Sequence, residues 1–429
     1  MKPFKVGLLG LGTVGTGVVR IVEGHQDDMK RQIGSSIEIE KILVQSKNKD
    51  RDIHIEPHKI TDDPWDVIED DNIDIIIEVM GGVELTKKYI LAALEQGKHV
   101  ITANKDLMAQ HGHEILVKAE EYGCDVFYEA SVAGGIPILR TIEEGLSSDR
   151  ITKIMGIVNG TTNYILSKMS LEGASYEEVL EEAQKLGYAE ADPTSDVGGF
   201  DAAYKMTILG TLGFHTYVSV EDVEIKGISE VSSDDIQYSS HLGYEIKLLG
   251  IAERQDDYIY LSVQPTLVKK SHPLANVNGV FNAVYVYGEA VGETMFYGPG
   301  AGEMPTATSV VADLIAVAKN SMLKVNGSRA RTSSYKEKKL KPLNQVVYKN
   351  FIRLYVADKA GVLAQITQVF TKYEVSLESV VQQPNPELSA AEIIIVTHDA
   401  NKESMGQVLK DFKEMDVIHE IKSVYRVEG

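Results

Sequence analysis

The sequence is poor in cysteine and in positive charge, and each shortage excludes a class of protein. One cysteine, Cys124, occurs among 429 residues. No disulfide can therefore form within the chain, which fits the reducing cytoplasm. Lys and Arg together number 43 against 63 Asp and Glu, which gives a net charge of −20. Nucleic acid and anionic membranes repel such a chain, and we expect neither as a partner.

Long hydrophobic runs are absent too. The N-terminus is charged and then apolar, as a signal peptide is, but its apolar run is short, broken by glycine and continuous with a glycine-rich motif. No stretch approaches the ~20 apolar residues of a membrane-spanning helix. Hydrophobic residues still make up 43% of the chain, which is enough for the cores of roughly two or three domains.

The start of the chain has the pattern of a dinucleotide-binding unit. An apolar strand over residues 3–10 leads into GLGTVG, and residues 18–32 continue as a helix. Glycines in such a turn permit a tight bend and let backbone N–H groups approach a pyrophosphate at a helix N-terminus. A glycine-rich turn that serves packing alone is the alternative. The candidate cofactor-binding residues are Gly10, Gly12, Thr13, Val14 and Gly15.

The second expected strand, residues 37–46, ends without the acidic residue that would bond the 2′-hydroxyl of an NAD ribose. Lys47, Lys49 and Arg51 follow it, and Asp50 is the only acid among them. Lysine and arginine attract the 2′-phosphate that distinguishes NADP, so the sequence favours NADP over NAD. A solvated basic loop is the alternative.

Strands and helices then alternate. Residues 72–80 read as a buried strand, residues 86–97 as a helix and residues 98–103 as another strand. This rhythm predicts an α/β fold with a doubly wound parallel sheet of the Rossmann type, in which loops at the carboxyl ends of the strands line the ligand crevice. The residues in those loops are Gly81, Gly82, Asn104 and Lys105.

Acids gather around one lysine in the segment Gly187–Lys205. Asp201 and Lys205 are four residues apart in an apolar helical pattern, so they project from one helix face. Before them, a capping box at Ser175 predicts a helix that ends at Gly187. A lysine at the start of an apolar helix needs partners, which acids can supply; a solvated acidic loop is the alternative. The acids of the loop are Glu190, Asp192 and Asp196.

This segment resembles the signature of the homoserine dehydrogenase family, and four further motifs resemble that family in the same order. The resemblance extends over residues 5–325. It implies reversible, NADP- or NAD-dependent reduction of L-aspartate 4-semialdehyde to L-homoserine, in the biosynthesis of threonine, methionine and isoleucine. The further motifs are His99–Ala109, Glu129–Thr141, Gly156–Leu166 and Tyr297–Leu314.

The resemblance also implies roles for individual residues. Lys205 is the general acid for the alkoxide that forms when hydride reaches the aldehyde, and Lys105 assists it. Glu190 and Asp201 match homoserine-binding positions, and Asp196 is a further candidate.

Two more sets of positions follow from the same resemblance. In the family, a glycine-rich loop holds a sodium-like monovalent cation with one glutamate and main-chain oxygens, the ligands that hard cations prefer. The residues that match this loop are Glu129, Val132, Gly134 and Ile136. Those that match positions of close backbone approach to the cofactor are Gly187 and Gly302.

Two alternatives stay open. A phosphorylating aldehyde dehydrogenase would need a thiolate beside a base, but Cys124 enters an apolar strand with no histidine within the next ten residues. A binding protein that senses nicotinamide and an amino acid could retain the fold. It would be expected to lose the lysines or their acids, and all of them are present.

From about Glu129 the pattern changes to strands rich in β-branched and aromatic residues, with two helices before residue 215. This predicts an α+β catalytic and dimerisation domain with a largely antiparallel sheet, and hence a homodimer or homotetramer. The helix over residues 309–323 is expected to return to the nucleotide domain. The strands are expected over residues 151–160, 223–229, 243–254, 258–268 and 283–298.

The C-terminal part follows a polar, basic linker. Beyond it the pattern has the order βαββαβ, which predicts a ferredoxin-like fold. With the turn Asp358–Leu363 after the first strand it resembles an ACT domain, a small-amino-acid sensor, and L-threonine is the expected effector. A module used only for assembly is the alternative. The predicted domains are 1–128 (dinucleotide-binding, with a returning segment near 303–325), 129–325 (catalytic and dimerisation), 326–349 (linker) and 350–429 (ACT).

Overall fold

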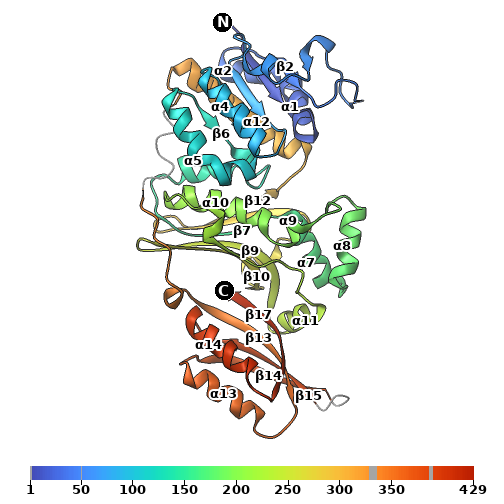
Figure 1. Ribbon diagram of the computed structural model, residues 1–429, viewed down its shortest axis with the longest axis vertical. Helices are drawn as coiled ribbons and strands as arrows, with labels where there is room; N and C mark the ends of the chain where they lie inside the picture. Colours follow the sequence, from blue (N-terminus) through green and yellow to red (C-terminus); the bar gives the residue numbers. More distant parts are fainter. Residues whose placement is uncertain (1, 50, 328–335, 386–389) are drawn as a thin grey trace. The chain divides into compact units, whose positions relative to one another are not determined.

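The computed structural model describes residues 2–49, 51–327, 336–385 and 390–429 (Figure 1). The chain forms two compact units. Unit 1 comprises Met1–Ile154, Tyr204–Glu221 and Asn282–Lys338, and unit 2 comprises Met155–Ala203, Asp222–Phe281 and Lys339–Gly429. Within the described ranges, no helix combines the length and the apolar character needed to cross a bilayer.

Unit 1 is built on a six-stranded parallel sheet. Its strands are β1 Phe4–Leu9, β2 Ile37–Leu43, β3 Ile60–Thr61, β4 Ile75–Glu78, β5 His99–Thr102 and β6 Val126–Phe127. They lie in the order β3-β2-β1-β4-β5-β6, and every pairing is parallel. The order changes direction between β1 and β4, which is where ligands bind in doubly wound sheets. The parallel sheet predicted from the alternating pattern is confirmed.

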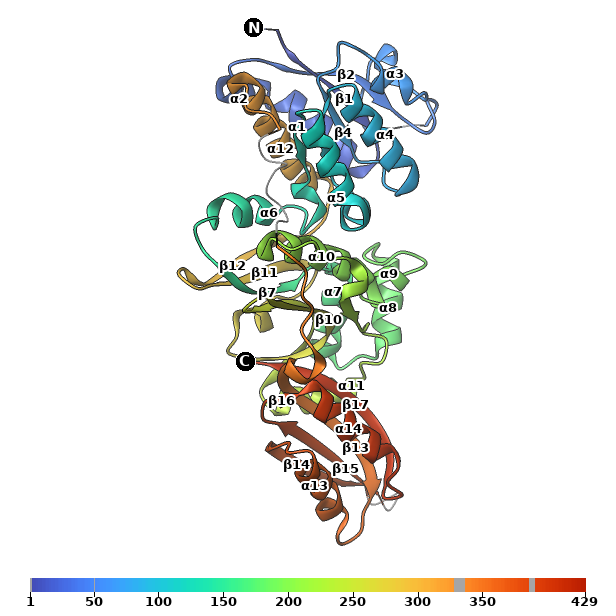
Figure 2. The same cartoon turned by 60° about the vertical axis from the view of Figure 1, so that its left-hand side comes forward.

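Helices cover both faces of this sheet. They are α1 Thr13–Gly24, α2 Gln26–Ile33, α3 Trp65–Ile68, α4 Glu84–Glu95, α5 Lys105–Glu121 and α12 Glu303–Leu323. Val6 and Leu8 of β1 share a core with α1, α2 and α12. The opposite face of β1 meets α3, because a Cβ added at Gly7 would lie 2.4 Å from Val67. Figure 2 shows α4 and α5 side by side, and they are in contact.

One predicted helix is divided. The pattern predicts a single helix over residues 18–32, but the chain turns at His25 (φ −117°, ψ 25°), directly after Gly24. Glycine is a weak helix former, so a break in the helix at this position costs little free energy.

The remaining elements of unit 1 are short. They include a 3₁₀ turn at Glu129–Ser131, α6 Ile138–Arg140, β11 Phe281–Gly288 and β12 Gly292–Pro299. β7 Ile151–Ile157, α10 Phe200–Phe214 and β11 contain residues of both units.

Unit 2 begins with helices and a long hairpin. The helices are α7 Gly160–Glu172, α8 Tyr176–Lys185, α9 Thr194–Val197 and α11 Ser233–His241, and the strands are β8 Val223–Ile225, β9 Tyr244–Gln255 and β10 Tyr258–Lys269. β9 and β10 pair antiparallel along their whole length. The predicted capping box of α8 is present at Ser175 and Glu178. The pattern missed α7 and α11; α7 buries Thr161, Asn163, Ile165 and Ser167 alike, so it has no amphipathic stripe to detect.

The C-terminal part of unit 2 has the predicted order, with one two-residue strand added. Its elements are β13 Val347–Ala357, α13 Val362–Lys372, β14 Leu377–Asn385, β15 Ala390–Thr397, β16 Ala400–Asn401, α14 Lys402–Lys413 and β17 Ile418–Glu428. Figure 2 shows α13 and α14 on one face of the strands. Phe370 and Phe412 of these helices join Ile352 of β13 in one core.

This C-terminal part shares a sheet with the hairpin. β17 pairs parallel with β10, with Thr266 opposite Arg426 and Val268 opposite Glu428. Part of the predicted linker, residues 328–335, lies outside the described residues. Just beyond it, the N–H of Ile259 in β10 donates to the carbonyl of Lys339 at 2.9 Å.

Candidate functional site

The glycine-rich turn joins β1 to α1. Gly10 has a φ of +108°, and a Cβ there would lie 3.0 Å from the backbone of Met80. A Cβ at Gly15 would lie 2.2 Å from the carbonyl oxygen of Gly10. Only glycine fits both positions. Gly12 precedes α1 and Thr13 begins it, so free N–H groups of a helix N-terminus face the turn, as phosphate binding requires.

A cavity of about 610 Å³ opens beside this turn. Its volume lies within the range of small-ligand sites. Besides the turn, the β4–α4 connection and the segment after β2 line it; the residues include Gly12, Val44, Lys49, Arg51, Met80 and Tyr89.

The basic loop after β2 divides into two parts. Lys49 and Arg51 line the cavity. The guanidinium of Arg51 donates to the carbonyls of Ser46 (2.6 Å) and Lys49 (2.8 Å), while its buried Nε has no hydrogen-bond partner among the described residues. Lys47 instead pairs with Asp62 at 2.7 Å, and this hydrogen bond raises the pKa of Lys47. Lys47 thereby neutralises the acid at the cavity wall, and Lys49 and Arg51 are left to face an anion.

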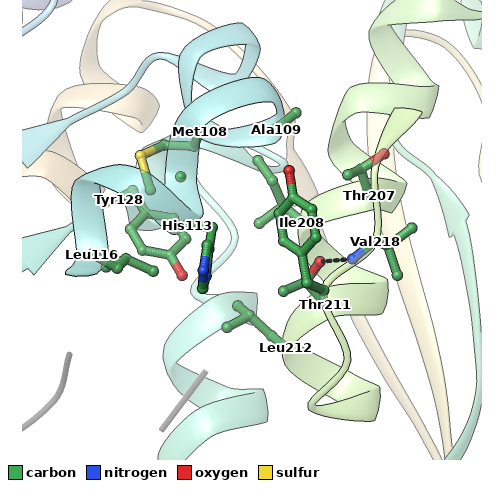
Figure 3. Close-up of a pocket in the computed structure, with 12 residues that line it drawn as sticks. Met108, Ala109, His113, Leu116, Tyr128, Thr207, Ile208, Thr211, Leu212 and Val218 are labelled. Atoms are coloured by element: carbon green, nitrogen blue, oxygen red, sulfur yellow. Dashed lines mark hydrogen bonds between the residues drawn. The ribbon is translucent and has the colours of Figure 1, made fainter. Parts of the chain in front are cut away.

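The two candidate catalytic lysines lie on α5 and α10. Figure 3 shows a cavity between these helices, of about 30 Å³, lined by residues such as Met108, Ala109, Ile208 and Leu212. That volume holds about two water molecules. Lys105 lies three residues before Met108, and Lys205 three before Ile208. Each lysine therefore lies one helical turn before residues that line this cavity, although neither lysine is itself among the lining residues.

Asn159 brings two of the candidate acids together. Its Nδ2 donates to Asp196 Oδ1 at 2.7 Å and to Asp201 Oδ2 at 2.8 Å. Its Oδ1 accepts from the N–H of Thr162 and so caps α7. Asp201 is buried and lies one turn before Lys205 on α10. Sequence reasoning missed Asn159, although it lies within a quoted motif; an asparagine before Gly160 signals a helix cap but does not name the acids it holds.

The other candidates in this loop are exposed. Glu190 is exposed and its carbonyl accepts from Gln184. Asp192 accepts hydrogen bonds from the N–H and the hydroxyl of Thr194, the first residue of α9. Gly187 follows α8 with a φ of +75°, as its predicted role in ending the helix requires.

Glu129 lies in a buried charged cluster. Its Oε1 accepts from the N–H of Leu139 at 2.7 Å and its Oε2 from that of Arg140 at 2.8 Å. Arg140 pairs with the buried Asp313 at 2.6 Å, and Asp313 accepts from the N–H of Glu129. Burial raises the pKa of Glu129. Two carboxylates and one guanidinium leave this cluster one negative charge when both acids are ionised.

The loop after Glu129 turns sharply. Ala133 (φ 53°) and Gly134 (φ 41°) both adopt left-handed conformations. The carbonyl of Gly134 accepts from Ser309 Oγ at 2.6 Å, and that of Ile136 from the N–H of Ile138 at 2.8 Å. Val132 is buried. No cluster of three or more His, Cys, Asp or Glu suited to a metal occurs among the described residues, so a cation here would rely on backbone oxygens.

Gly302 and Cys124 complete the candidate set. Gly302 (φ +121°) precedes α12, whose first residue, Glu303, pairs with Arg20 of α1 at 2.9 Å. Cys124 is buried, and burial raises the pKa of its thiol to about 11. A thiol of that pKa is not a nucleophile at neutral pH, which removes the thiolate-dependent alternative.

Comparison with known proteins covers the whole chain. Residues 10–129 match the family model for the NAD binding domain of homoserine dehydrogenase, residues 137–315 the model for homoserine dehydrogenase, and residues 351–416 the model for the ACT domain. The homoserine dehydrogenase of Bacillus subtilis is 55% identical over 432 residues, which cover 100% of this chain and 99% of the relative.

Solved structures agree. A homoserine dehydrogenase from Thiobacillus denitrificans has a TM-score of 0.93 and 38% identity, covering 100% of this chain and 99% of its own. A hyperthermophilic archaeal homoserine dehydrogenase in complex with NADPH has a TM-score of 0.63 and 27% identity, covering 75% of this chain and 98% of its own.

Proposed function

This chain belongs to the homoserine dehydrogenase family, and on that premise we propose that it interconverts L-homoserine and L-aspartate 4-semialdehyde with NADP. The chain is an NAD(P)-dependent oxidoreductase with a C-terminal ACT domain, and the alternative of a non-catalytic sensor is not supported. The observation that carries the residue assignment is α10, which presents Lys205 one turn after the buried Asp201.

Lys205 is the proton donor and acceptor in this proposal. The nicotinamide, when bound, exchanges a hydride with the carbinol carbon of the substrate. In reduction, the aldehyde oxygen becomes an alkoxide and takes a proton from the ammonium of Lys205; in oxidation, the amine of Lys205 takes the hydroxyl proton. Lys105 adds positive charge near the developing alkoxide. Each lysine lies one helical turn before residues of α5 and α10 that line one small cavity, and this proximity supports a shared task.

Carboxylates bind the substrate ammonium. Glu190 is exposed and free to meet a ligand, and Asp201 and Asp196 are held by Asn159. An asparagine amide carries no charge, so these hydrogen bonds orient the two carboxylates without themselves neutralising them.

Lys49 and Arg51 select NADP. Both line the cavity beside the glycine-rich turn, and the unpartnered Nε of Arg51 suits an anionic ligand. Gly10, Gly12, Thr13, Val14 and Gly15 hold the pyrophosphate, and the backbone at Gly187 and Gly302 approaches the cofactor.

A sodium-like cation occupies the loop of Glu129, Val132, Gly134 and Ile136. The excess negative charge of the buried cluster fits one monovalent cation, and the carbonyls of Gly134 and Ile136 each keep a second lone pair. Its task is structural.

The remaining proposals concern the whole protein. The ACT domain binds L-threonine and lowers activity, and the enzyme works in the cytoplasm as a homodimer or homotetramer. We retain the domain limits 1–128, 129–325, 326–349 and 350–429, with α12 returning to the core of unit 1.

Enzyme assays test this function. Purified protein with L-homoserine should reduce NADP, followed by the absorbance of the reduced nicotinamide, and should reduce NAD less well. Replacement of Lys49 and Arg51 by alanine should raise KM for NADP far more than for NAD, because only NADP carries the 2′-phosphate. Lys59→Ala is the matched control, since Lys59 pairs with Glu56 and neither residue lines the cavity. Activity on an unrelated hydroxy acid but none on homoserine would reject the proposal.

A further inference from the structure

Glu78 is a buried carboxylate that the proposed mechanism does not use. It ends β4 and is 0% exposed. Burial of a carboxylate costs free energy unless donors surround it. Its Oε1 accepts from the N–H groups of Met80 (2.8 Å) and Gly81 (3.1 Å), and its Oε2 accepts from the hydroxyl of Thr102 (2.5 Å).

Thr102 and Asn104 extend these contacts to the next turn. The N–H of Asn104 donates to Thr102 Oγ1 at 3.0 Å, so the hydroxyl hydrogen is directed to Glu78. Asn104 Nδ2 donates to the carbonyl of Gly82 at 2.6 Å, and Asn104 caps α5. A closed ring of hydrogen bonds therefore joins the β4–α4 turn to the start of α5, whose first residue is Lys105.

Donors face both carboxylate oxygens of Glu78, an arrangement that favours the ionised form. Burial raises its pKa, and the hydrogen bonds from Thr102, Met80, Gly81 and Asn104 oppose that rise. These partners carry no charge, so hydrogen bonds rather than an ion pair fix the orientation of the carboxylate. The turn it holds also forms the wall against which Gly10 packs, because a Cβ at Gly10 would lie 3.0 Å from Met80 N.

We propose that Glu78 is a positioning residue for the reaction. Its carboxylate fixes the Met80–Gly82 turn and, through Thr102 and Asn104, the N-terminus of α5 that presents Lys105. This inference rests on the role proposed above for Lys105. A displacement of about 1 Å at a catalytic group can cost on the order of 10²-fold in rate, so a ring that locks both turns serves catalysis as well as folding.

A double-mutant cycle tests this role with the full-length enzyme. Thr102→Val removes the hydroxyl but keeps the side-chain volume and leaves the two N–H contacts of Glu78. We expect it to lower kcat by about tenfold with little change in the KM for homoserine. Thr102→Ser should restore kcat to within about threefold. Glu78→Gln, which turns an acceptor into a donor facing other donors, should lower kcat by ~10- to 10²-fold.

Whether the effect of Thr102→Val on kcat depends on Lys105 distinguishes a positioning role from an effect on stability alone. In a Lys105→Ala background, Thr102→Val should cost less than about twofold, because the group it positions is gone. The matched control is Asp125→Asn. Asp125 is also buried in unit 1, and it accepts from Asn320, Asn326 and the N–H of Gly327; this change should lower the melting temperature and affect kcat equally in both backgrounds.

The outcomes are distinguishable. A wild-type enzyme inactive on homoserine would reject the proposed function itself. An active wild type in which Thr102→Val costs the same factor with and without Lys105, or in which Lys105→Ala has no effect, would overturn the positioning role alone.

Discussion

Lys247 is 2% exposed, and its ammonium donates to the carbonyl of Val277 (2.7 Å) and to Asn278 Oδ1 (2.9 Å). These oxygens are neutral, so burial dominates and lowers the pKa of Lys247 to about 8 from 10.5. Between these pH values the unfolded chain binds more protons than the folded one. Stability therefore rises with pH across this window.

The Lys247→Met variant lacks this contribution. The free energy of unfolding of the wild type minus that of the variant should increase as pH rises from about 8 to about 10, by roughly 3 kcal/mol at most. Urea unfolding at several pH values measures it. A difference that stays constant or falls with pH would show that Lys247 is not held in this depressed state.

Lys205→Ala should lower kcat by on the order of 10²-fold or more while fold and NADP binding persist, because it removes a proton donor that acts only in the transition state. Steady-state kinetics with homoserine, with Lys185→Ala on the exposed face of α8 as control, make the comparison. A near-normal kcat with a raised KM would reassign Lys205 to binding.

Sequence could reveal residues whose chemistry is local, and it failed where a role depends on distant partners. The capping box at Ser175 and the Asp201–Lys205 spacing were readable from neighbours within one turn. Asn159 and Glu78 were not, because their partners lie 37, 42 and 24 residues away.

At the scale of elements, buried charges join the ACT strands to α11 and to the β9–β10 hairpin. Asp235 is 0% exposed. It accepts from Ser423 Oγ (2.6 Å) and from the hydroxyl of Tyr425 (2.9 Å), and pairs with Arg353 at 2.8 Å. Arg426 of β17 pairs with Glu253 of β9 at 2.5 Å. α11 and the hairpin are thus joined to the ACT strands by direct bonds.

Asp235→Ala should destabilise unit 2 by about 3 kcal/mol, since it removes one of the three acids that pair with the buried Arg353 and the acceptor of the Ser423 and Tyr425 hydroxyls. Glu230→Ala, at an exposed acid nearby, should change stability by less than ~0.5 kcal/mol. Thermal or urea unfolding of both variants provides the measurement, and equal stabilities would show that the buried pair does not hold these elements together.

Periodicity identified most elements of the parallel sheet and of the tail, and it missed α7. The longer strands of the parallel sheet and the βαββαβ order of the tail are visible in the sequence because each strand alternates or runs apolar as its layer requires. α7 did not appear, since polar residues buried on all sides erase the stripe. The parallel contact between β10 and β17 joins segments about 160 residues apart, a separation that no local pattern records.

For the whole molecule, the shared sheet bears on regulation. The polar linker suggests a module that could be cut away, but its removal would expose the edge of β10. It would also leave Asp235 without Arg353 of β13, and Glu253 without Arg426 of β17. An effector bound at the ACT domain could instead act through this sheet, provided that it binds two states of the protein with different affinity.

L-threonine should therefore inhibit homoserine oxidation by the full-length enzyme. Asp358→Ala, in the exposed turn between β13 and α13, should weaken inhibition while activity without threonine stays unchanged. Glu403→Ala at the start of α14, also exposed, is the control. If threonine has no effect on the wild type, or inhibits both variants equally, the ACT domain serves assembly or another ligand.

The most direct test of the account uses homoserine that carries deuterium on its carbinol carbon. Hydride transfer from that carbon to the nicotinamide predicts deuterium in the reduced NADP, seen by mass spectrometry, and a Lys205→Ala enzyme that transfers the same label far more slowly. Reduced NADP without deuterium, or label transfer unaffected by the loss of Lys205, would contradict the account.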